Sequence, residues 1–193
     1  ASTALPVSLV LAQTDALPLA VGALATSSAL SQTTWLTAPT DAPTVNVRFA
    51  FAGQKADAVY AYTFAAATRF DTVDTTITWP ALQAAWRGNN ERFGAVAVLT
   101  DTLPALTQLL GKAGETVVGY GTEGEVAAAA WANAADTPPA LVLLPFDQLE
   151  PRLVVLAIDG QNPVENANNF DAATYPLVAT LYAENLGKTP AEA

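Results

Sequence analysis

The sequence lacks cysteine, histidine and methionine entirely across its 193 residues. Without cysteine it can form no disulfide, thiol nucleophile or thiolate metal site. Without histidine it lacks the commonest general base and the commonest metal ligand. A complete reading frame would begin with methionine, so we expect a processed protein or an excised domain. Its first residues, Ala1 to Thr3, are typical of the start of a mature chain after a signal or anchor segment, which predicts an extracytoplasmic location.

Positive charge is also scarce. Eight Lys and Arg residues face 18 Asp and Glu residues, which gives a net charge of −10. The basic residues are scattered, and so acidic a chain repels nucleic acid and anionic lipid. No apolar run approaches the roughly 20 residues that a membrane span needs. We therefore expect neither a nucleic-acid partner nor membrane insertion of this segment.

Hydrophobic residues are abundant, at 51% of the chain against 13% charged residues, so a sizeable core can form. Thr44–Ala52 alternates apolar and polar residues with the period of a half-buried strand. A turn at Gly53–Asp57 and a second strand at Ala58–Ala66 should complete an antiparallel hairpin. Leu153–Ile158 is a further apolar strand-like run.

The middle of the chain alternates strands and helices. A helix is expected at Trp79–Arg87, with Pro80 in its first turn. The strands and helices expected after it are Ala95–Leu99 (strand), Leu103–Leu110 (helix, ended by Gly111), Thr116–Tyr120 (strand), Glu123–Asn133 (helix) and Ala140–Leu144 (strand). This order is typical of an α/β lobe with a mostly parallel sheet.

Three segments carry a family resemblance. Arg69–Gly88 (RFDTVDTTITWPALQAAWRG), then Val154–Pro163 (VVLAIDGQNP), then Tyr175–Leu177 (YPL) occur in this order. They resemble segments of extracytoplasmic solute-binding proteins of the phosphate-binding type. The resemblance implies an α/β fold of the type II periplasmic-binding-protein kind, with two lobes, mixed sheets and a two-strand crossover hinge. Lobe one would comprise residues 1–66 and 146–193, and lobe two residues 67–145.

A narrower resemblance links Leu143–Gly160 and the later Tyr175–Leu177 to the domain that precedes the catalytic domain in some CapA-type proteins of capsule or poly-γ-glutamate biosynthesis. That catalytic part resembles a metallophosphoesterase and needs histidine ligands, which this chain lacks. The resemblance implies a non-catalytic module that binds a small molecule or a polymer end. Residues 187–193 would be a tail or linker to a downstream metallophosphoesterase domain.

The sequence departs from the phosphate-binding pattern where the anion would be held. Phosphate binders of this fold carry an arginine and a Ser-Gly-Thr turn, whereas here the strand Ala95–Leu99 leads into Thr100-Asp101-Thr102. No arginine is present there, and Asp101 would repel phosphate. Recognition of a tetrahedral anion is therefore in doubt. The alternative is a structural or interaction module that kept the fold and lost its ligand.

Candidate ligand-binding residues lie at two helix starts and after one strand. Free N–H groups at helix N-termini bind anions, but Thr and Asp also serve there as simple caps. Arg69 could hold a carboxylate through two parallel hydrogen bonds, or form a surface ion pair with Asp71 or Asp74. The candidate positions are Thr68, Arg69, Thr100, Asp101, Thr102, Gly121 and Thr122.

The other polar and aromatic clusters have two interpretations each. Tyr60, Tyr62 and Phe64 share one strand face, which would either stack on a ligand or pack in the core or between the lobes. The pairs Asp71/Asp74 and Asp159/Asn162 offer oxygen ligands for calcium, but their spacing favours turns. No nucleophile elbow, dinucleotide fingerprint or marked carboxylate pair is present. We expect no enzyme activity, cofactor or metal.

Overall fold

The computed structural model describes residues 9–13, 33–36, 47–51, 57–132, 138–164, 170–171 and 173–185. The expected tail at 187–193 lies outside these residues. The chain divides into two compact units, one of residues 1–61 with 180–193 and one of residues 62–179. Among the described residues, no helix has the length and hydrophobicity to cross a membrane.

The first unit contains a sheet whose described strands run in the order β2 (Thr33–Leu36), β1 (Leu9–Gln13), β3 (Val47–Ala50) and β11 (Val178–Asn185). Strand β1 is parallel to both β2 and β3, whereas β11 is antiparallel to β3. The expected hairpin between β3 and the next strand is therefore wrong. Strand β11, from the end of the chain, occupies that place beside β3.

The second unit is built on strands β4 (Asp57–Arg69), β8 (Ala140–Pro145), β6 (Ala95–Leu99) and β7 (Val117–Tyr120), in that order. Strand β6 is parallel to β7 and β8, and β4 is antiparallel to β8. All residues of β8 are buried, as expected for a strand covered on both faces. This is the mixed sheet that the resemblance implied.

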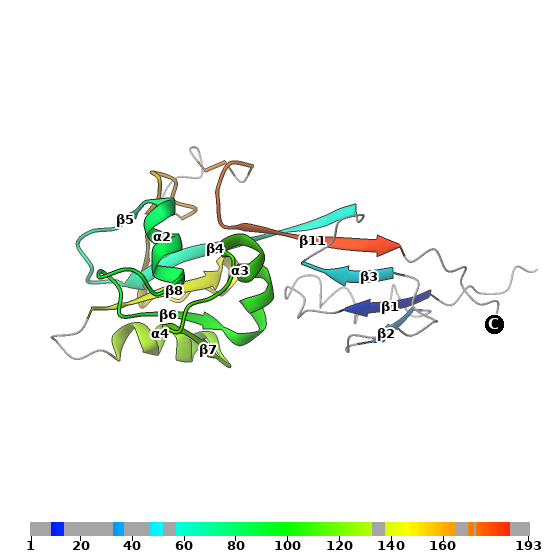
Figure 1. Cartoon of the computed structure of the whole chain (residues 1–193), viewed down its shortest axis with the longest axis horizontal. Helices are drawn as coiled ribbons and strands as arrows, with labels where there is room; N and C mark the ends of the chain where they lie inside the picture. The colour runs from blue at the N-terminus through cyan, green and yellow to red at the C-terminus, as the bar shows by residue number, and fades with distance from the viewer. Residues whose placement is uncertain are drawn as a thin grey trace, which may run out of the picture. The chain divides into compact units, whose positions relative to one another are not determined.

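Helices cover both faces of this sheet, as Figure 1 shows. Helix α4 (Glu123–Trp131) lies on one side, and α2 (Trp79–Trp86) and α3 (Leu103–Leu110) lie on the other. Side chains alternate between the faces of a strand, so each strand supplies both layers. The core between α4 and the sheet is formed by Ala65, Ala67, Ala97, Leu99, Val126, Ala130, Val142, Leu144 and Val155.

Local signals explain the helix ends. The hydroxyl of Thr78 accepts a hydrogen bond from the Ala81 N–H at 3.3 Å, which caps α2 as an N-cap residue should. Helix α3 follows a 3₁₀ turn, η2 (Thr100–Thr102), and ends at Gly111 with φ +80°, a conformation that favours glycine. The expected helices at these places are confirmed, with α4 two residues shorter than expected.

The expected strand at Leu153–Ile158 is two strands with different partners. Strand β9 (Leu153–Val155) pairs with β4, and β10 (Ala157–Ile158) pairs with β5 (Thr76–Ile77) in a separate small sheet. The break lies at Leu156, whose N–H donates to the Ala66 carbonyl at 2.8 Å. Both pairings lie within the second unit, which comprises residues 62–179, whereas the resemblance placed residues from 146 onward in the first lobe.

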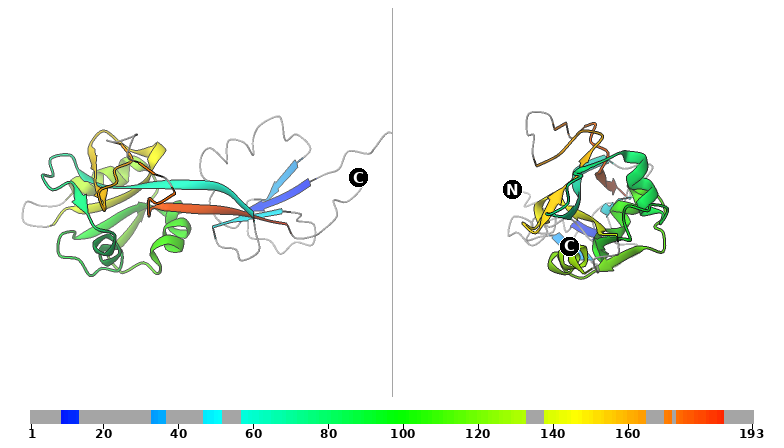
Figure 2. Two further views of the ribbon diagram at one scale, coloured as in Figure 1. Left: turned by 90° about the horizontal axis from the view of Figure 1, so that it is seen from above. Right: turned by 90° about the vertical axis from the view of Figure 1, so that its left-hand side faces the viewer.

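Two strands pass from one unit into the other. Strand β4 crosses between Ala61 and Tyr62, and β11 crosses between Ala179 and Thr180. They are neighbours in the strand order, and both can be followed in Figure 2. The crossings were expected near Phe64–Thr68 and near Leu144–Phe146. The first lies a few residues earlier, and the second lies at the start of β11.

Candidate functional site

Two of the three candidate clusters, Thr100–Thr102 and Gly121–Thr122, lie at the same end of the second unit's sheet. Because β6 is parallel to β7, with Leu99 opposite Tyr120, the residues after both strands lie at the same carboxyl end. The Thr100 hydroxyl joins them by donating to the Tyr120 carbonyl at 3.1 Å. Gly119 permits this approach, because a Cβ there would lie 2.7 Å from the Thr100 Oγ1. Thr100–Thr102 and Gly121–Thr122 are thus brought together.

The polar side chains of η2 either donate hydrogen bonds to carbonyls of the chain or are negatively charged, and neither kind can bind an anion. The Thr102 side chain is buried, and its hydroxyl donates to the Leu99 carbonyl at 2.8 Å. No side chain caps the start of α3. Asp101 is exposed in the same turn, where its carboxylate adds negative charge. This turn therefore offers an anion neither a basic side chain nor a free threonine hydroxyl.

The backbone N–H groups in the turn before α4 donate to a side chain of that helix. The Glu125 carboxylate accepts hydrogen bonds from the Gly121 N–H at 3.0 Å and the Thr122 N–H at 3.1 Å. The Thr122 hydroxyl in turn accepts from the Glu125 N–H at 3.3 Å. This reciprocal arrangement is a capping box. The donors that the sequence predicted for a ligand thus bind a carboxylate of the chain itself.

Thr68 and Arg69 lie at the opposite end of the sheet. Strand β4 is antiparallel to β8, so its last residues reach the amino end of β8, where the buried Thr68 hydroxyl donates to the Ala140 carbonyl at 3.1 Å. Arg69 pairs with Asp71 at 2.5 Å and lies over the Trp131 ring, 4.9 Å from its centroid. The hydrogen bond from Arg69 lowers the pKa of the Asp71 carboxyl. Thr68 and Arg69 are therefore separated from the other candidates.

Two of the three aromatic residues of β4, Tyr62 and Phe64, pack in the second unit. Phe64 is fully buried and Tyr62 is 6% exposed, and their ring centroids lie 4.7 Å apart. Tyr60, nearer the start of the strand, is half-buried. The core interpretation of this face holds for the two residues that lie in the second unit, because buried rings cannot stack on a ligand.

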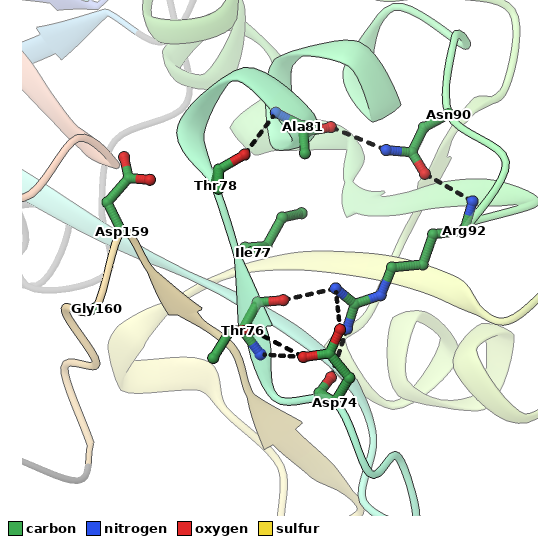
Figure 3. A pocket seen from close by; sticks show the side chains of 9 residues that line it. All are labelled: Asp74, Thr76, Ile77, Thr78, Ala81, Asn90, Arg92, Asp159 and Gly160. Atoms are coloured by element: carbon green, nitrogen blue, oxygen red, sulfur yellow. Dashed lines mark hydrogen bonds and ion pairs between the residues drawn. The ribbon is translucent and has the colours of Figure 1, made fainter.

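A pocket with a volume of about 370 Å³ lies beside α2 and the small β5–β10 sheet (Figure 3). One wall is a network around Arg92, whose guanidinium donates to the Thr76 carbonyl at 2.6 Å and pairs with the Asp74 carboxylate at 3.1 Å. The Thr76 N–H and hydroxyl also bind Asp74, at 3.1 and 2.8 Å. These hydrogen bonds, the one from the Thr76 hydroxyl first, lower the pKa of Asp74.

The opposite wall is the N-terminus of α2. Asp159 reaches it from the end of β10, and its carboxylate oxygens lie 3.2 and 3.3 Å from the Trp79 N–H that donates to them. Asp159 has φ +48°, a left-handed conformation that Asp tolerates better than most residues. A carboxylate is stabilised at this helix end by the free N–H groups and the helix dipole. This site too is occupied by the chain's own anion.

The calcium alternative finds no support in the described part of the chain, where no group of three or more acidic residues could hold a metal. Asp71 pairs with Arg69, Asp74 pairs with Arg92, and Asp159 caps α2. Asn162 accepts a hydrogen bond from the Val164 N–H at 2.9 Å, which is a turn contact. Sequence reasoning missed Arg92 and the cap made by Asp159. The Asp159-Gly160 pair indicates a turn, but no local signal marked the contact of Asp159 with α2 or the network around Arg92.

Comparison with known proteins places the fold. No family model matches the sequence, and no curated protein matches it. Among solved structures, an ABC-type phosphate transport receptor from Vibrio cholerae is similar, with a TM-score of 0.68 at 10% identity over 94% of this chain and 88% of that one. PstS from Borrelia burgdorferi has a TM-score of 0.58 at 13% identity, covering 91% and 86% of the two chains.

A regulatory protein shares the same architecture. The CcmR regulatory domain of Synechocystis PCC6803, in complex with 2-PG, has a TM-score of 0.54 at 11% identity, covering 95% of this chain and 89% of that one. These similar structures are binding proteins and a regulatory domain, and at such identities they establish the fold alone. None of them supports the link to CapA-type proteins. The chain has the α/β fold of periplasmic binding proteins, with a mixed sheet.

Proposed function

We propose that this chain is a non-catalytic ligand-binding module of the solute-binding type, located outside the cytoplasm, that does not bind tetrahedral anions. One observation carries the proposal: carboxylates of the chain itself already bind the N–H groups at two helix starts. Asp159 does so at α2 and Glu125 does so before α4. A phosphate would have to displace these carboxylates, and at η2 it would meet Asp101.

The energetic reason is that an anion site needs donors that are free before the ligand arrives. Binding in place of Glu125 would break two hydrogen bonds and leave a carboxylate beside the ligand's own negative charge. The net charge of −10 acts in the same direction at longer range. A neutral or cationic solute, or the uncharged part of a polymer end, meets no such penalty.

A thermal-shift screen with the whole chain tests this proposal. Phosphate and sulfate are compared with amino acids, γ-glutamyl peptides, amines and sugars, since a ligand at 100 times its Kd stabilises the folded state by about 2.7 kcal/mol. We expect no shift with phosphate and a saturable shift with a neutral or cationic solute. Saturable phosphate binding would contradict the proposal. A flat response to the whole panel would instead favour an interaction module without a ligand.

The accessory role in capsule or poly-γ-glutamate biosynthesis is a second candidate, carried by the resemblance of Leu143–Gly160 with Tyr175–Leu177. It predicts a histidine-containing metallophosphoesterase domain in the same gene and binding of a γ-glutamyl peptide. The gene sequence and a titration with such a peptide test it. Fractionation of the source cells tests the extracytoplasmic location, and recovery of the protein in the cytoplasmic fraction would contradict it.

A further inference from the structure

An apolar pocket with a volume of about 270 Å³ lies at the carboxyl end of β8 in the second unit. Its lining residues are Thr63, Phe146, Pro163 and Phe170. Phe146 directly follows β8, as the first residue of the 3₁₀ turn η3 (Phe146–Gln148). Because β8 is parallel to β6, this pocket lies at the same end of the sheet as Thr100 and Gly121. It shares no lining residue with the Arg92 pocket.

Phe146 is exposed where burial would be expected. The ring is 44% exposed, although it follows a strand whose residues are all buried. An exposed phenylalanine ring beside an apolar hollow offers surface that a ligand can cover favourably. Phe70, which is also exposed, at least packs on Trp131 with centroids 5.2 Å apart. Phe146 has no ring partner among the described residues.

The walls of the pocket are held in place before any ligand arrives. Pro145 pairs with Phe64 at the end of β8, which positions Phe146 beyond it and Thr63 nearby on β4. Phe170 packs edge-on against Tyr175 at 5.1 Å, and Tyr175 is 3% exposed. Preformed walls avoid the ordering cost that weakens binding. The Thr63 hydroxyl, which makes no hydrogen bond with a described residue, is the polar group that a ligand could reach.

Size and charge define the ligand class. A dry cavity of about 150 Å³ binds benzene in another protein, so this pocket has room for one ring and a short chain. Asp147 and Asp171 each directly follow one of the lining phenylalanines. Asp171 binds the Ala173 N–H at 2.9 Å, but Asp147 makes no hydrogen bond or ion pair with described residues. Aromatic faces also attract cations.

We propose that this pocket is the ligand site of the module and binds an aromatic ring that carries a positively charged amine. The ring would lie between Phe146 and Phe170, and the ammonium group would face the Asp147 carboxylate. This inference rests on the proposed function, because it identifies the cationic class of ligand that a module without anion donors can take.

Isothermal titration of the whole chain with three matched probes tests the inference. Phenethylamine, 2-phenylethanol and 3-phenylpropionate share the ring and differ in charge. We expect phenethylamine to bind with a Kd of about 1 mM or tighter, a value within reach of a ligand of this size. The alcohol should bind at least several-fold more weakly, and the propionate should not bind measurably. Equal binding of all three probes would overturn the proposal.

Two variants and one control locate the site. Phe146→Ala should weaken phenethylamine binding at least tenfold, and Asp147→Asn should weaken it several-fold without changing the affinity for the alcohol. Phe70→Ala, at the opposite end of the sheet, should leave both affinities unchanged. Unchanged amine binding by Phe146→Ala overturns the proposal, as does a dimer that Phe146→Ala dissociates, because a second copy would then occupy the pocket. Phosphate in the same titration separates the two failures: phosphate binding refutes the proposed function, whereas absence of both phosphate and amine binding refutes only this inference.

Discussion

Replacement of Tyr175 by phenylalanine should stabilise the protein. The Tyr175 side chain is 3% exposed, and its hydroxyl oxygen is buried with no hydrogen-bond partner among the described residues. In the unfolded chain water solvates this group, so folding loses those hydrogen bonds without replacing them. An unsatisfied buried polar group costs about 1–3 kcal/mol. Tyr175→Phe removes this cost.

The expected gain is slightly smaller than the full penalty. Removing one oxygen leaves a small void, and at about 24 cal/mol per Å³ of cavity this costs a few tenths of a kcal/mol. The net stabilisation should be about 1–2 kcal/mol, which corresponds to roughly 2–8 °C in melting temperature for a domain of this size. Calorimetry at neutral pH, supported by the fluorescence of the four tryptophans, measures it. Tyr120→Phe, at a half-buried position, is the matched control and should change stability by less than about 0.5 kcal/mol.

A pH series provides an independent check of the same side chain. Burial raises the pKa of the Tyr175 hydroxyl well above its usual value. Near pH 11 the unfolded chain therefore loses this proton while the folded chain keeps it, and the wild type loses stability as pH rises above about 10. The advantage of Tyr175→Phe should grow by about 1.4 kcal/mol between pH 9 and pH 11. A variant that is less stable than the wild type, or a difference that does not change with pH, would refute the reasoning.

Substitutions at three further positions test the local geometry of the second unit. Gly114→Ala should destabilise by about 1–3 kcal/mol in urea unfolding, because the new Cβ would lie 2.4 Å from the Arg87 carbonyl carbon; an unchanged midpoint would contradict this. Glu125→Ala should cost about 1 kcal/mol by opening the capping box, whereas Glu125→Gln, which retains an acceptor, should cost less. Asp159→Asn should cost about 0.3–1 kcal/mol at low salt and less at high salt, and a loss that is independent of salt would exclude a charge effect at α2.

The helices and buried strands of the second unit could be predicted because their signals are local. Pro80 after Thr78, Glu125 three residues after Thr122, and Gly111 after an apolar helix each act within one turn of backbone. A continuous apolar run such as Ala140–Leu144 is favourable only as a strand of a sheet that is covered on both faces. The family resemblance pointed to the same fold, which the similar structures support.

Pairings between distant segments could not be predicted in this way. Strand β11 lies beside β3 across more than a hundred residues of sequence, and the β9–β10 break at Leu156 depends on which strand each half meets. The cap that Asp159 makes on α2 joins residues 80 positions apart. Such contacts depend on loop closure and on competition among strand edges, and neither leaves a mark in the local pattern.

The sequence by itself determined the chemical limits of this protein. It excludes histidine and cysteine chemistry within this chain, and its net charge of −10 predicts that nucleic acid is repelled. Only the tertiary structure decided how the candidate residues are used. It separates Thr68 and Arg69 from the other candidates and gives the helix-end donors to Glu125 and Asp159. The physical reason is that a hydrogen-bond donor is available to a ligand only if no nearer acceptor reaches it, and that depends on the folded arrangement.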